Sequence, residues 1–217
     1  MKSTLNKIAA AFGLAMTLGL AATQAQANLL LNGSFESGVK DTATPGVCSD
    51  SITSWVVSNV GTPCGGIDWI PGSGWTAQDG NYSIDLNSFD TGAISQSFAT
   101  VAGGVYQVSF YMAGNPGQQN VKSMDVLIDN VDLISGSPDF QFNNAGTSES
   151  NMGWTFNTFN FTASNATSNL QFKSLMSGAW GPALDNVSVV QAVPEPATLA
   201  LLALGLLGIG LRRRQVA

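Results

Sequence analysis

The stretch Val105-Tyr106-Gln107-Val108-Ser109-Phe110-Tyr111-Met112 alternates between two kinds of side chain. After Val105, its even positions are all apolar or aromatic, whereas Gln107 and Ser109 lie between them. Because successive side chains of a strand point to opposite faces of the sheet, this period of two predicts a half-buried β-strand.

Shorter runs of the same character lie on both sides of this stretch, separated by turns rich in Gly, Asn, Ser and Pro. They cover residues 94–98, 124–128, 154–161, 170–175 and 184–190. No long segment with a 3.6-residue period lies between the two ends of the chain. The pattern predicts an all-β fold, an antiparallel sandwich formed by one domain over residues 28–192. Trp154 falls in one of the runs and is expected to be buried.

The first residues have the three parts of a secretory signal peptide. Lys2 and Lys7 are basic, residues 8–22 are apolar, and Ala25-Gln26-Ala27 is a small-x-small cleavage site. We therefore expect a signal peptide over residues 1–27 and a mature chain that begins at Asn28.

The last residues, 193–217, contain three elements in a fixed order. Pro194-Glu195-Pro196 precedes the uncharged run 197–211, and Arg212, Arg213 and Arg214 follow that run. A helix over the run would be about 22 Å long, shorter than a hydrocarbon core of about 30 Å. The positive-inside bias predicts that the arginines stay in the cytoplasm and that the body lies across the membrane.

This order of motif, apolar helix and basic cluster resembles the PEP-CTERM sorting signal of bacteria that make extracellular polysaccharide. The resemblance implies that an exosortase recognises the Pro-Glu-Pro element, removes the hydrophobic tail and passes the body outward. It also implies transient anchoring in the inner membrane with the body in the periplasm, followed by release to the cell surface or matrix. A plain C-terminal anchor is the alternative, and the sequence leaves open whether the tail is cut.

The predicted domain is acidic and has no histidine. Residues 28–192 contain three lysines, no arginine and thirteen carboxylates. Nucleic-acid phosphates and anionic lipid surfaces both require Lys and Arg, so binding to either is not expected. Without histidine there is no Ser-His-Asp arrangement and no histidine-bound zinc. An enzyme is not expected, although a glycan hydrolase needs only two carboxylates and is kept as the least favoured alternative.

Cys48 and Cys64 are the two cysteines of the chain. In an exported protein an even pair predicts a disulfide, which here would close a turn-rich loop. A loop of this size would gain roughly 3 kcal/mol from the bridge in the chain-entropy model.

Four further stretches carry a second resemblance. They are Asn28-Leu29-Leu30-Leu31-Asn32-Gly33-Ser34-Phe35-Glu36, Asp79-Gly80-Asn81-Tyr82-Ser83-Ile84-Asp85-Leu86, Gly92-Ala93-Ile94-Ser95-Gln96 and Gly181-Pro182-Ala183-Leu184-Asp185-Asn186-Val187-Ser188-Val189. Together they resemble the choice-of-anchor C domain and, more broadly, the galactose-binding-like jelly rolls that include many carbohydrate-binding modules. The resemblance implies a jelly-roll sandwich whose first and last segments lie close together.

The same resemblance implies a structural calcium ion. Glu36 and Asp185 match positions that often help to hold one, and Asn32, Ser34 and Asp79 could add oxygens. Ca²⁺ binds six to eight oxygen ligands, so the chemistry is suitable. The alternative is that Glu36 and Asp185 only accept hydrogen bonds from turn amides.

Tryptophans in predicted loops are the candidate sugar platforms, because an indole face can stack on a pyranose ring. Trp69 and Trp75 flank a Pro-Gly-Ser-Gly turn, and Trp180 precedes the last predicted strand. Loop aromatics are better binding candidates than strand aromatics, although each could instead cap the sandwich. Asp68, Asp79 and Asp85 are candidate partners for sugar hydroxyls, although exposed carboxylates usually face only solvent.

These observations predict a non-catalytic exported protein that binds or associates with extracellular polysaccharide. A structural protein of biofilm or envelope, which acts through contacts with matrix proteins and has no sugar affinity, is the alternative.

Overall fold

The computed structural model describes residues 26–40, 50–59, 65–132 and 137–192. The predicted disulfide partners Cys48 and Cys64, nearly all of the signal peptide, and the apolar tail with its arginines lie outside the described residues. Within the described part, no helix is long and apolar enough to cross a membrane.

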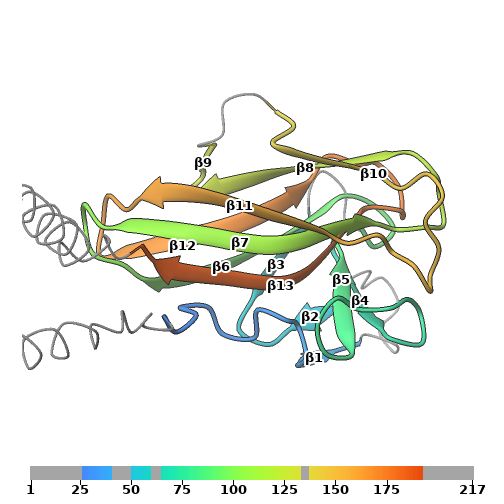
Figure 1. The fold of residues 1–217 in the computed structure, drawn as a ribbon, viewed down its shortest axis with the longest axis horizontal. Coiled ribbons are helices and arrows are strands. Elements are labelled where there is room, and N and C mark those ends of the chain that lie inside the picture. The colour runs from blue at the N-terminus through green and yellow to red at the C-terminus, as the bar shows by residue number, and fades with distance from the viewer. Residues whose placement is uncertain (1–25, 41–49, 60–64, 133–136, 193–217) are drawn as a thin grey trace, which may run out of the picture.

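Two antiparallel sheets pack face to face, which confirms the predicted sandwich (Figure 1). One sheet has the order β10-β8-β12-β6-β3, with β9 added beside β8; the other has the order β11-β7-β13-β5-β4. A separate ribbon pairs β1 with β2. The strands are β1 (Gly38–Val39), β2 (Ser51–Ile52), β3 (Val56–Asn59), β4 (Asp68–Pro71), β5 (Tyr82–Asp85), β6 (Gly92–Ala99), β7 (Val105–Gly114), β8 (Val121–Ile128), β9 (Val131–Asp132), β10 (Phe140–Asn143), β11 (Thr155–Thr162), β12 (Thr167–Ser174) and β13 (Pro182–Gln191).

The chain crosses between the two sheets at most steps after β5, although β8, β9 and β10 stay in one sheet. β6, β8 and β12 belong to one sheet, whereas β5, β7, β11 and β13 belong to the other. Neighbours within a sheet are therefore mostly distant in sequence, as β13 between β5 and β7 illustrates. This alternation with antiparallel pairing is the jelly-roll arrangement that the sequence predicted.

The core lies between the sheets and has the composition that the alternating pattern predicted. Tyr106, Val108, Phe110 and Met112 of β7 are all buried, whereas Gln107 is exposed. Their partners come from the opposite sheet; the rings of Phe110 and Phe172 of β12, for example, meet edge to face with centroids 5.1 Å apart.

The opening and closing segments lie side by side. The backbone N–H of Leu29 donates to Val189 O at 2.8 Å, and the N–H of Val187 donates to Gly33 O at 2.8 Å. Residues 28–37 form bends and turns rather than a strand, so this contact fastens an irregular segment to β13. The predicted closeness of the two segments is confirmed.

Two expectations about tryptophans are wrong. Trp154 precedes β11 and is only half buried, with its Nε1–H donating to Thr76 O at 3.0 Å. Trp75 is 5% exposed and forms a small second core with Met152, Ala113 and Ala183. The turn after β4 folds over one end of the outer sheet face, so that it buries the indole that local sequence had placed on a surface loop.

Candidate functional site

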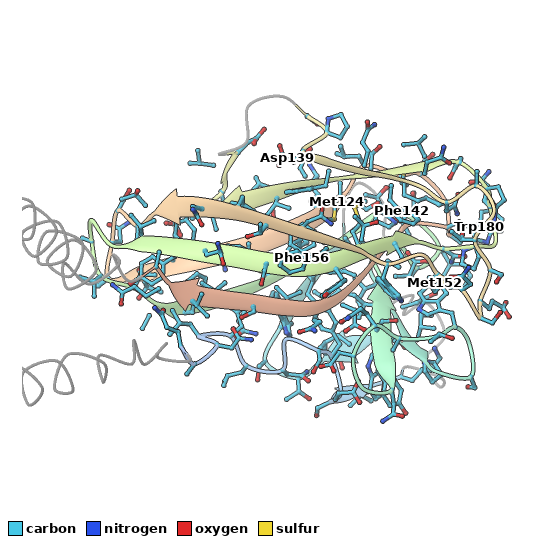
Figure 2. The ribbon with its side chains drawn as sticks, in the orientation of Figure 1. Met124, Asp139, Phe142, Met152, Phe156 and Trp180 are labelled. Atoms are coloured by element: carbon cyan, nitrogen blue, oxygen red, sulfur yellow. The ribbon has the colours of Figure 1, made fainter. Side chains whose placement is uncertain are left out.

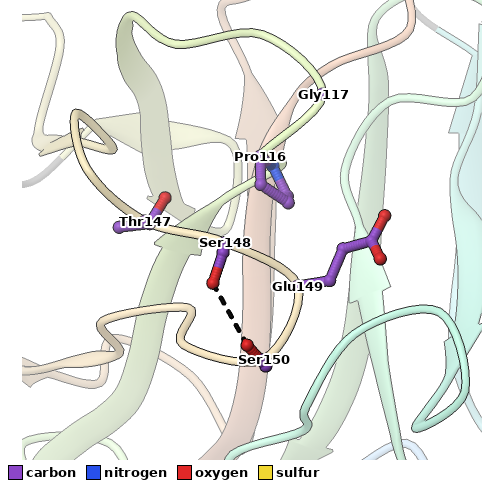
Figure 3. Close-up of a pocket in the computed structure, with 6 residues that line it drawn as sticks. All are labelled: Pro116, Gly117, Thr147, Ser148, Glu149 and Ser150. Atoms are coloured by element: carbon purple, nitrogen blue, oxygen red, sulfur yellow. Dashed lines mark hydrogen bonds between the residues drawn. The ribbon is translucent and has the colours of Figure 1, made fainter.

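A cleft opens among the loops at one end of the sandwich (Figure 3). It lies between the β7–β8 connection and the β10–β11 connection, and its volume is about 440 Å³. Ligand pockets typically have volumes of about 300–1,000 Å³, so the cleft could hold a small molecule or part of a chain. The lining residues are Pro116, Gly117, Thr147, Ser148, Glu149 and Ser150.

The lining combines hydroxyl groups, one carboxylate and a proline ring. The hydroxyls of Ser148 and Ser150 lie 3.3 Å apart, and Figure 3 shows the side chain of Glu149, between them in the chain, pointing away from these hydroxyls. Hydroxyls both donate and accept, and a carboxylate accepts strongly, so the cleft suits a ligand with many hydroxyl groups.

Trp180 lies beside this cleft. Its side chain is 44% exposed, and the backbone of Gly117 lies so close to the indole Nε1 that a Cβ at Gly117 would overlap it. Figure 2 shows Trp180 among the loops at the end of the sandwich opposite the close of β13. Of the three tryptophans predicted to bind a ligand, Trp180 is the one that the structure leaves exposed at a cleft.

Trp69 and Trp75 are placed differently from the prediction. Trp75 is buried, and its Nε1–H donates to Ser83 Oγ at 2.7 Å. Trp69 belongs to β4 rather than to a loop, and it is half buried, with its ring stacked on Tyr82 at 4.0 Å between centroids. Both indoles have structural roles, because their faces are covered by the protein itself.

A buried polar network positions the loops around Trp180. Asp85 is fully buried; its Oδ1 accepts the N–H of Asn87 at 2.9 Å and of Gly181 at 3.1 Å, and its Oδ2 accepts Asn115 Nδ2 at 2.7 Å. The carboxylate thus joins the turn after β5, the β7–β8 loop and the residue that follows Trp180. The prediction that Asp85 contacts a ligand is wrong, because both oxygens of its buried carboxyl group accept hydrogen bonds from within the protein.

Two more buried side chains complete the network. Asn144 Nδ2 donates to Asn115 O at 2.8 Å and to Gln118 O at 2.9 Å, which ties the two loops of the cleft together. Lys122 is fully buried, and its Nζ donates to Trp180 O at 2.8 Å. Buried hydrogen bonds therefore fix the loops at the rim of the cleft before any ligand binds.

The pKa values reflect this burial. Loss of hydration raises the pKa of Asp85 to about 8, although hydrogen bonds from Asn115 and Asn87 favour the charged form. Burial likewise lowers the pKa of Lys122, and the nearby charge of Asp85 opposes that change. Among the buried side chains that the structure describes, Asn87 has an Oδ1 without a hydrogen-bond partner, and this atom faces the same backbone as Asp85 Oδ1, at Gly181.

The residues predicted to bind calcium lie near one turn. Glu36 Oε1 accepts the N–H of Asn81 and Tyr82 at 2.9 and 2.8 Å, and Asp185 Oδ2 accepts those of Gln78 and Asp79 at 2.7 and 3.0 Å. This is the hydrogen-bonding alternative that the sequence left open. Burial raises the pKa of the Asp185 carboxyl to about 7, and the charge of Asp79 adds to the rise.

The secondary calcium candidates have other contacts. Asn32 Nδ2 donates to Ser37 O and Thr53 O, and its Oδ1 accepts the N–H of Ser37 at 3.1 Å. Ser34 is half buried and Asp79 is exposed. Across the described ranges, no group of three or more His, Cys, Asp or Glu residues is placed to hold a metal ion. Calcium binding at Glu36 and Asp185 stays a prediction.

Sequence reasoning missed the cleft. The turn at Asn115-Pro116-Gly117 is visible in the sequence, but nothing local shows that it faces residues 147–150. The buried network was also missed, because Lys122 and Asn144 are residue types that usually face water. Nothing in a single sequence indicates that Gly117 contacts Trp180, which follows it 63 residues later.

Fold and cleft together define an all-β jelly-roll sandwich with a ligand-sized opening among its loops. The chain belongs to the family described as "Protein of unknown function (DUF642)", whose profile matches residues 28–190. A second profile, the PEP-CTERM protein-sorting motif, matches residues 192–214. This confirms the sorting motif predicted around Pro194, Glu195 and Pro196 and marks the chain as an exported protein sorted to the cell envelope. Membership of the choice-of-anchor C group stays a prediction.

One curated relative is Halomucin from Haloquadratum walsbyi (strain DSM 16790 / HBSQ001), which is 33% identical over 176 residues. The match covers 77% of this chain and 2% of Halomucin, so the chain spans a very small part of that protein's length.

Several solved structures are similar to the chain at low identity. TmCBM61 in complex with β-1,4-galactotriose is 16% identical with a TM-score of 0.47, and the match covers 76% of this chain and 99% of that one. The family 35 module from Paenibacillus barcinonensis is 17% identical with a TM-score of 0.45, over 64% and 94%. The CBM22-1 xylan-binding domain of Xyn10C from the same organism is 16% identical with a TM-score of 0.46, over 80% and 99%. These values are too low to say anything of function.

Proposed function

We propose that this protein is a non-catalytic, exported carbohydrate-binding protein that associates with extracellular polysaccharide through the cleft beside Trp180. One observation carries the proposal: an exposed indole lies against the backbone of Gly117, beside a cleft of ligand size whose lining is rich in hydroxyl groups. A sugar ring has an apolar face that stacks on an aromatic ring, and its edges carry hydroxyls that need hydrogen-bond partners.

The charge of the protein favours a neutral glycan. The chain has a formal net charge of −6, and Glu149 lies in the cleft itself. A uronic-acid or sulfated polymer would be repelled by this field, whereas a neutral hexose polymer would meet only hydrogen-bonding groups and the Trp180 ring.

The lining of the cleft supports binding without catalysis. Glycoside hydrolysis uses two carboxyl groups on either side of the scissile bond. Glu149 is the one carboxylate among the six residues that line the cleft. Asp85 lies in the network that joins the loops and is fully buried, so its carboxylate cannot reach a sugar in the cleft.

Processing by an exosortase is part of the same proposal. The sorting motif at residues 192–214 would deliver the chain to such an enzyme after a signal peptide over residues 1–27 has exported it. The body would then stay in the periplasm, anchored by the tail, until transfer to the surface or the matrix.

Titration of soluble neutral oligosaccharides against the full chain tests the binding site, and isothermal titration calorimetry measures the affinity without relying on Trp180 as a reporter. We expect Trp180→Ala and Glu149→Gln each to weaken binding about tenfold or more, since each removes a contact made only in the complex. Phe156→Ala is the matched control, because Phe156 is 55% exposed but lies on the outer face of the five-stranded sheet (Figure 2).

Two results would contradict the proposal. Equal affinity of the wild type and the Trp180→Ala variant would exclude this cleft as the site. No binding to any neutral glycan, together with a loss of matrix cohesion in a deletion strain, would favour the structural alternative, in which matrix proteins are the partners. Release of reducing sugar from the producer's polysaccharide would instead identify a hydrolase.

A further inference from the structure

The edge strand β11 is unlike the other edges of the two large sheets. It has eight residues and pairs with β7 along its whole length, whereas the edge strands β3, β4 and β10 have four residues each. In Figure 1, β11 forms the upper border of the sheet that faces the viewer. Long edge strands present rows of free peptide groups, so proteins usually shorten or protect them.

None of the usual protecting devices is present in β11. Charged residues and proline are absent from the chain between Glu149 and Lys173, a stretch that contains the whole strand. By contrast, the short edge β4 contains both Asp68 and Pro71. Exposed Lys or Asp side chains, proline and bulges are what normally prevent a strand from adding to an edge.

The hydrogen bonds show which peptide groups of β11 point outward. Ala163 N–H donates to Gly104 O at 2.9 Å, on the β7 side. Antiparallel ladders alternate, so the peptide groups of every second residue turn to the free edge. These outward residues have exposed side chains on the outer face, and they are Phe156, Thr158, Asn160 and Thr162. Outside the strand ladders, the hydrogen bonds of the described ranges do not reach their backbone.

We propose that β11 is a self-association surface, where it pairs antiparallel with β11 of a second copy of this chain. The two five-stranded sheets then become one continuous sheet. A register centred on Phe159 places Phe156 opposite Thr162 and Thr158 opposite Asn160. This register satisfies every outward N–H and C=O of both strands, so the edge is complementary to itself, as a two-fold interface requires.

A second copy fits this edge better than a partner of opposite charge would. The strand is uncharged, so it gives no electrostatic attraction to a basic or acidic segment and no repulsion between copies. The remaining surface is acidic, which keeps two copies apart everywhere except along such a neutral border.

The direction of the strands decides where such a pair can form. β11 and β13 both run antiparallel to β7, so they run in the same direction. The last residue of β11 therefore lies at the same end of the sheet as Gln191, the last residue of β13. Antiparallel pairing across the edge therefore puts the two C-terminal exits at opposite ends. Copies anchored side by side in one membrane cannot pair in this way, whereas released copies, or copies on facing surfaces, can. This inference does not depend on sugar binding.

The first test compares two substitutions at the same level of the sheet. Asn160 pairs with Gln107 of β7, and both side chains are exposed on the same face. In the proposed register, Asn160→Glu brings two carboxylates to diagonal positions about 7–8 Å apart. Sedimentation of the full chain in mild detergent should show that Asn160→Glu weakens dimerisation about tenfold or more, with recovery at high salt. Gln107→Glu, which places the same charge one strand away from the edge, should leave dimerisation unchanged.

The second test follows amide hydrogen exchange by residue. At high protein concentration the amides of Phe156, Thr158, Asn160 and Thr162 should be protected, and on dilution they should exchange freely. The amides of Phe159 and Phe161, which bond β7, should stay protected in both conditions. A monomeric wild type at every concentration, equal effects of the two glutamates, or protection that appears only when a glycan is added would each overturn the proposal.

Discussion

Asp185 and Glu36 hold the same turn from two sides. Asp185 is buried in β13, and its Oδ2 accepts the amides of residues 78 and 79. Glu36 is exposed in the opening segment, and its Oε1 accepts the amides of residues 81 and 82. The two ends of the domain thus meet at a turn in the first half of its sequence.

Removing the buried carboxylate should cost more than removing the exposed one. Asp185→Ala leaves partly buried amides without an acceptor, and we expect the free energy of unfolding to fall by about 2–4 kcal/mol. Glu36→Gln keeps an acceptor oxygen at a wet site and should cost about 1 kcal/mol or less. Urea unfolding measures the loss in each variant. Equal losses would mean that burial does not decide how much each carboxylate contributes to holding the turn.

Calcium binding has a separate test at these residues. Binding of Ca²⁺ to the folded state alone would raise the melting temperature, and a chelator would reverse the rise. If Glu36 and Asp185 are ligands, Glu36→Gln should abolish the rise. A melting temperature that is identical with Ca²⁺ and with chelator would show that the two carboxylates only accept hydrogen bonds from backbone amides.

Stability should decrease as the pH rises. Burial raises the pKa of Asp85 from 3.8 to about 8, so the folded state keeps a proton that the unfolded state loses. The free energy of unfolding is then highest near pH 4 and falls toward pH 8. Asp185, with a pKa of about 7, contributes in the same direction at lower pH.

Asp85→Asn isolates the Asp85 contribution. The amide has the shape of the protonated carboxyl and cannot ionise, so the fall in stability between pH 7 and 8 should flatten in this variant. Chemical unfolding at several pH values measures the slope. An unchanged slope in the Asp85→Asn variant would show that other groups cause it.

Gly181 should not tolerate a methyl group. A Cβ at this position would overlap the Oδ1 atoms of Asp85 and Asn87, both of which are fully buried. Overpacking of this kind costs about 1–3 kcal/mol, so Gly181→Ala should lower the melting temperature clearly. At Gly72 the nearest atom to a new Cβ is Asn81 O at 3.4 Å, and Gly72→Ala should be nearly neutral. Similar losses in both variants would contradict the packing at Gly181.

Substitution of Trp75 should lower stability, whereas substitution of Trp180 should lower sugar affinity. Trp75→Ala empties the small second core, and we expect a loss of about 3–5 kcal/mol. Trp180→Ala removes an exposed ring, so unfolding should change by about 0.5 kcal/mol or less while sugar affinity falls. Unfolding curves and oligosaccharide titrations on the same two variants provide the comparison, and a large loss of stability in Trp180→Ala would contradict its exposed placement.

Local pattern was enough to predict the sandwich but not the roles of the tryptophans. The alternation around Phe110 correctly identified which side chains face the core, because strand geometry fixes this within a few residues. Trp69 and Trp75 flank a turn in the sequence, yet one is in a strand and the other is buried. Their burial depends on what packs over the turn, which is set by distant residues such as Met152.

The candidate site was predictable only in part. Trp180 was identified as an exposed loop aromatic, and the structure places it so. The cleft beside it arises where Asn144 ties two loops together through Asn115 O and Gln118 O. No property of these asparagines in the sequence distinguishes them from the many that face solvent.

The sequence by itself determined the strand pattern, the acidic histidine-free composition and the sorting motif at residues 192–214, because each is a local or additive property. Only the tertiary structure decided that Asp85 is an internal tie, that Trp180 borders a cleft and that β11 ends a sheet without protection. These depend on which strands become neighbours, and in a fold that crosses between sheets at most steps, neighbours are set by contacts distant in the chain.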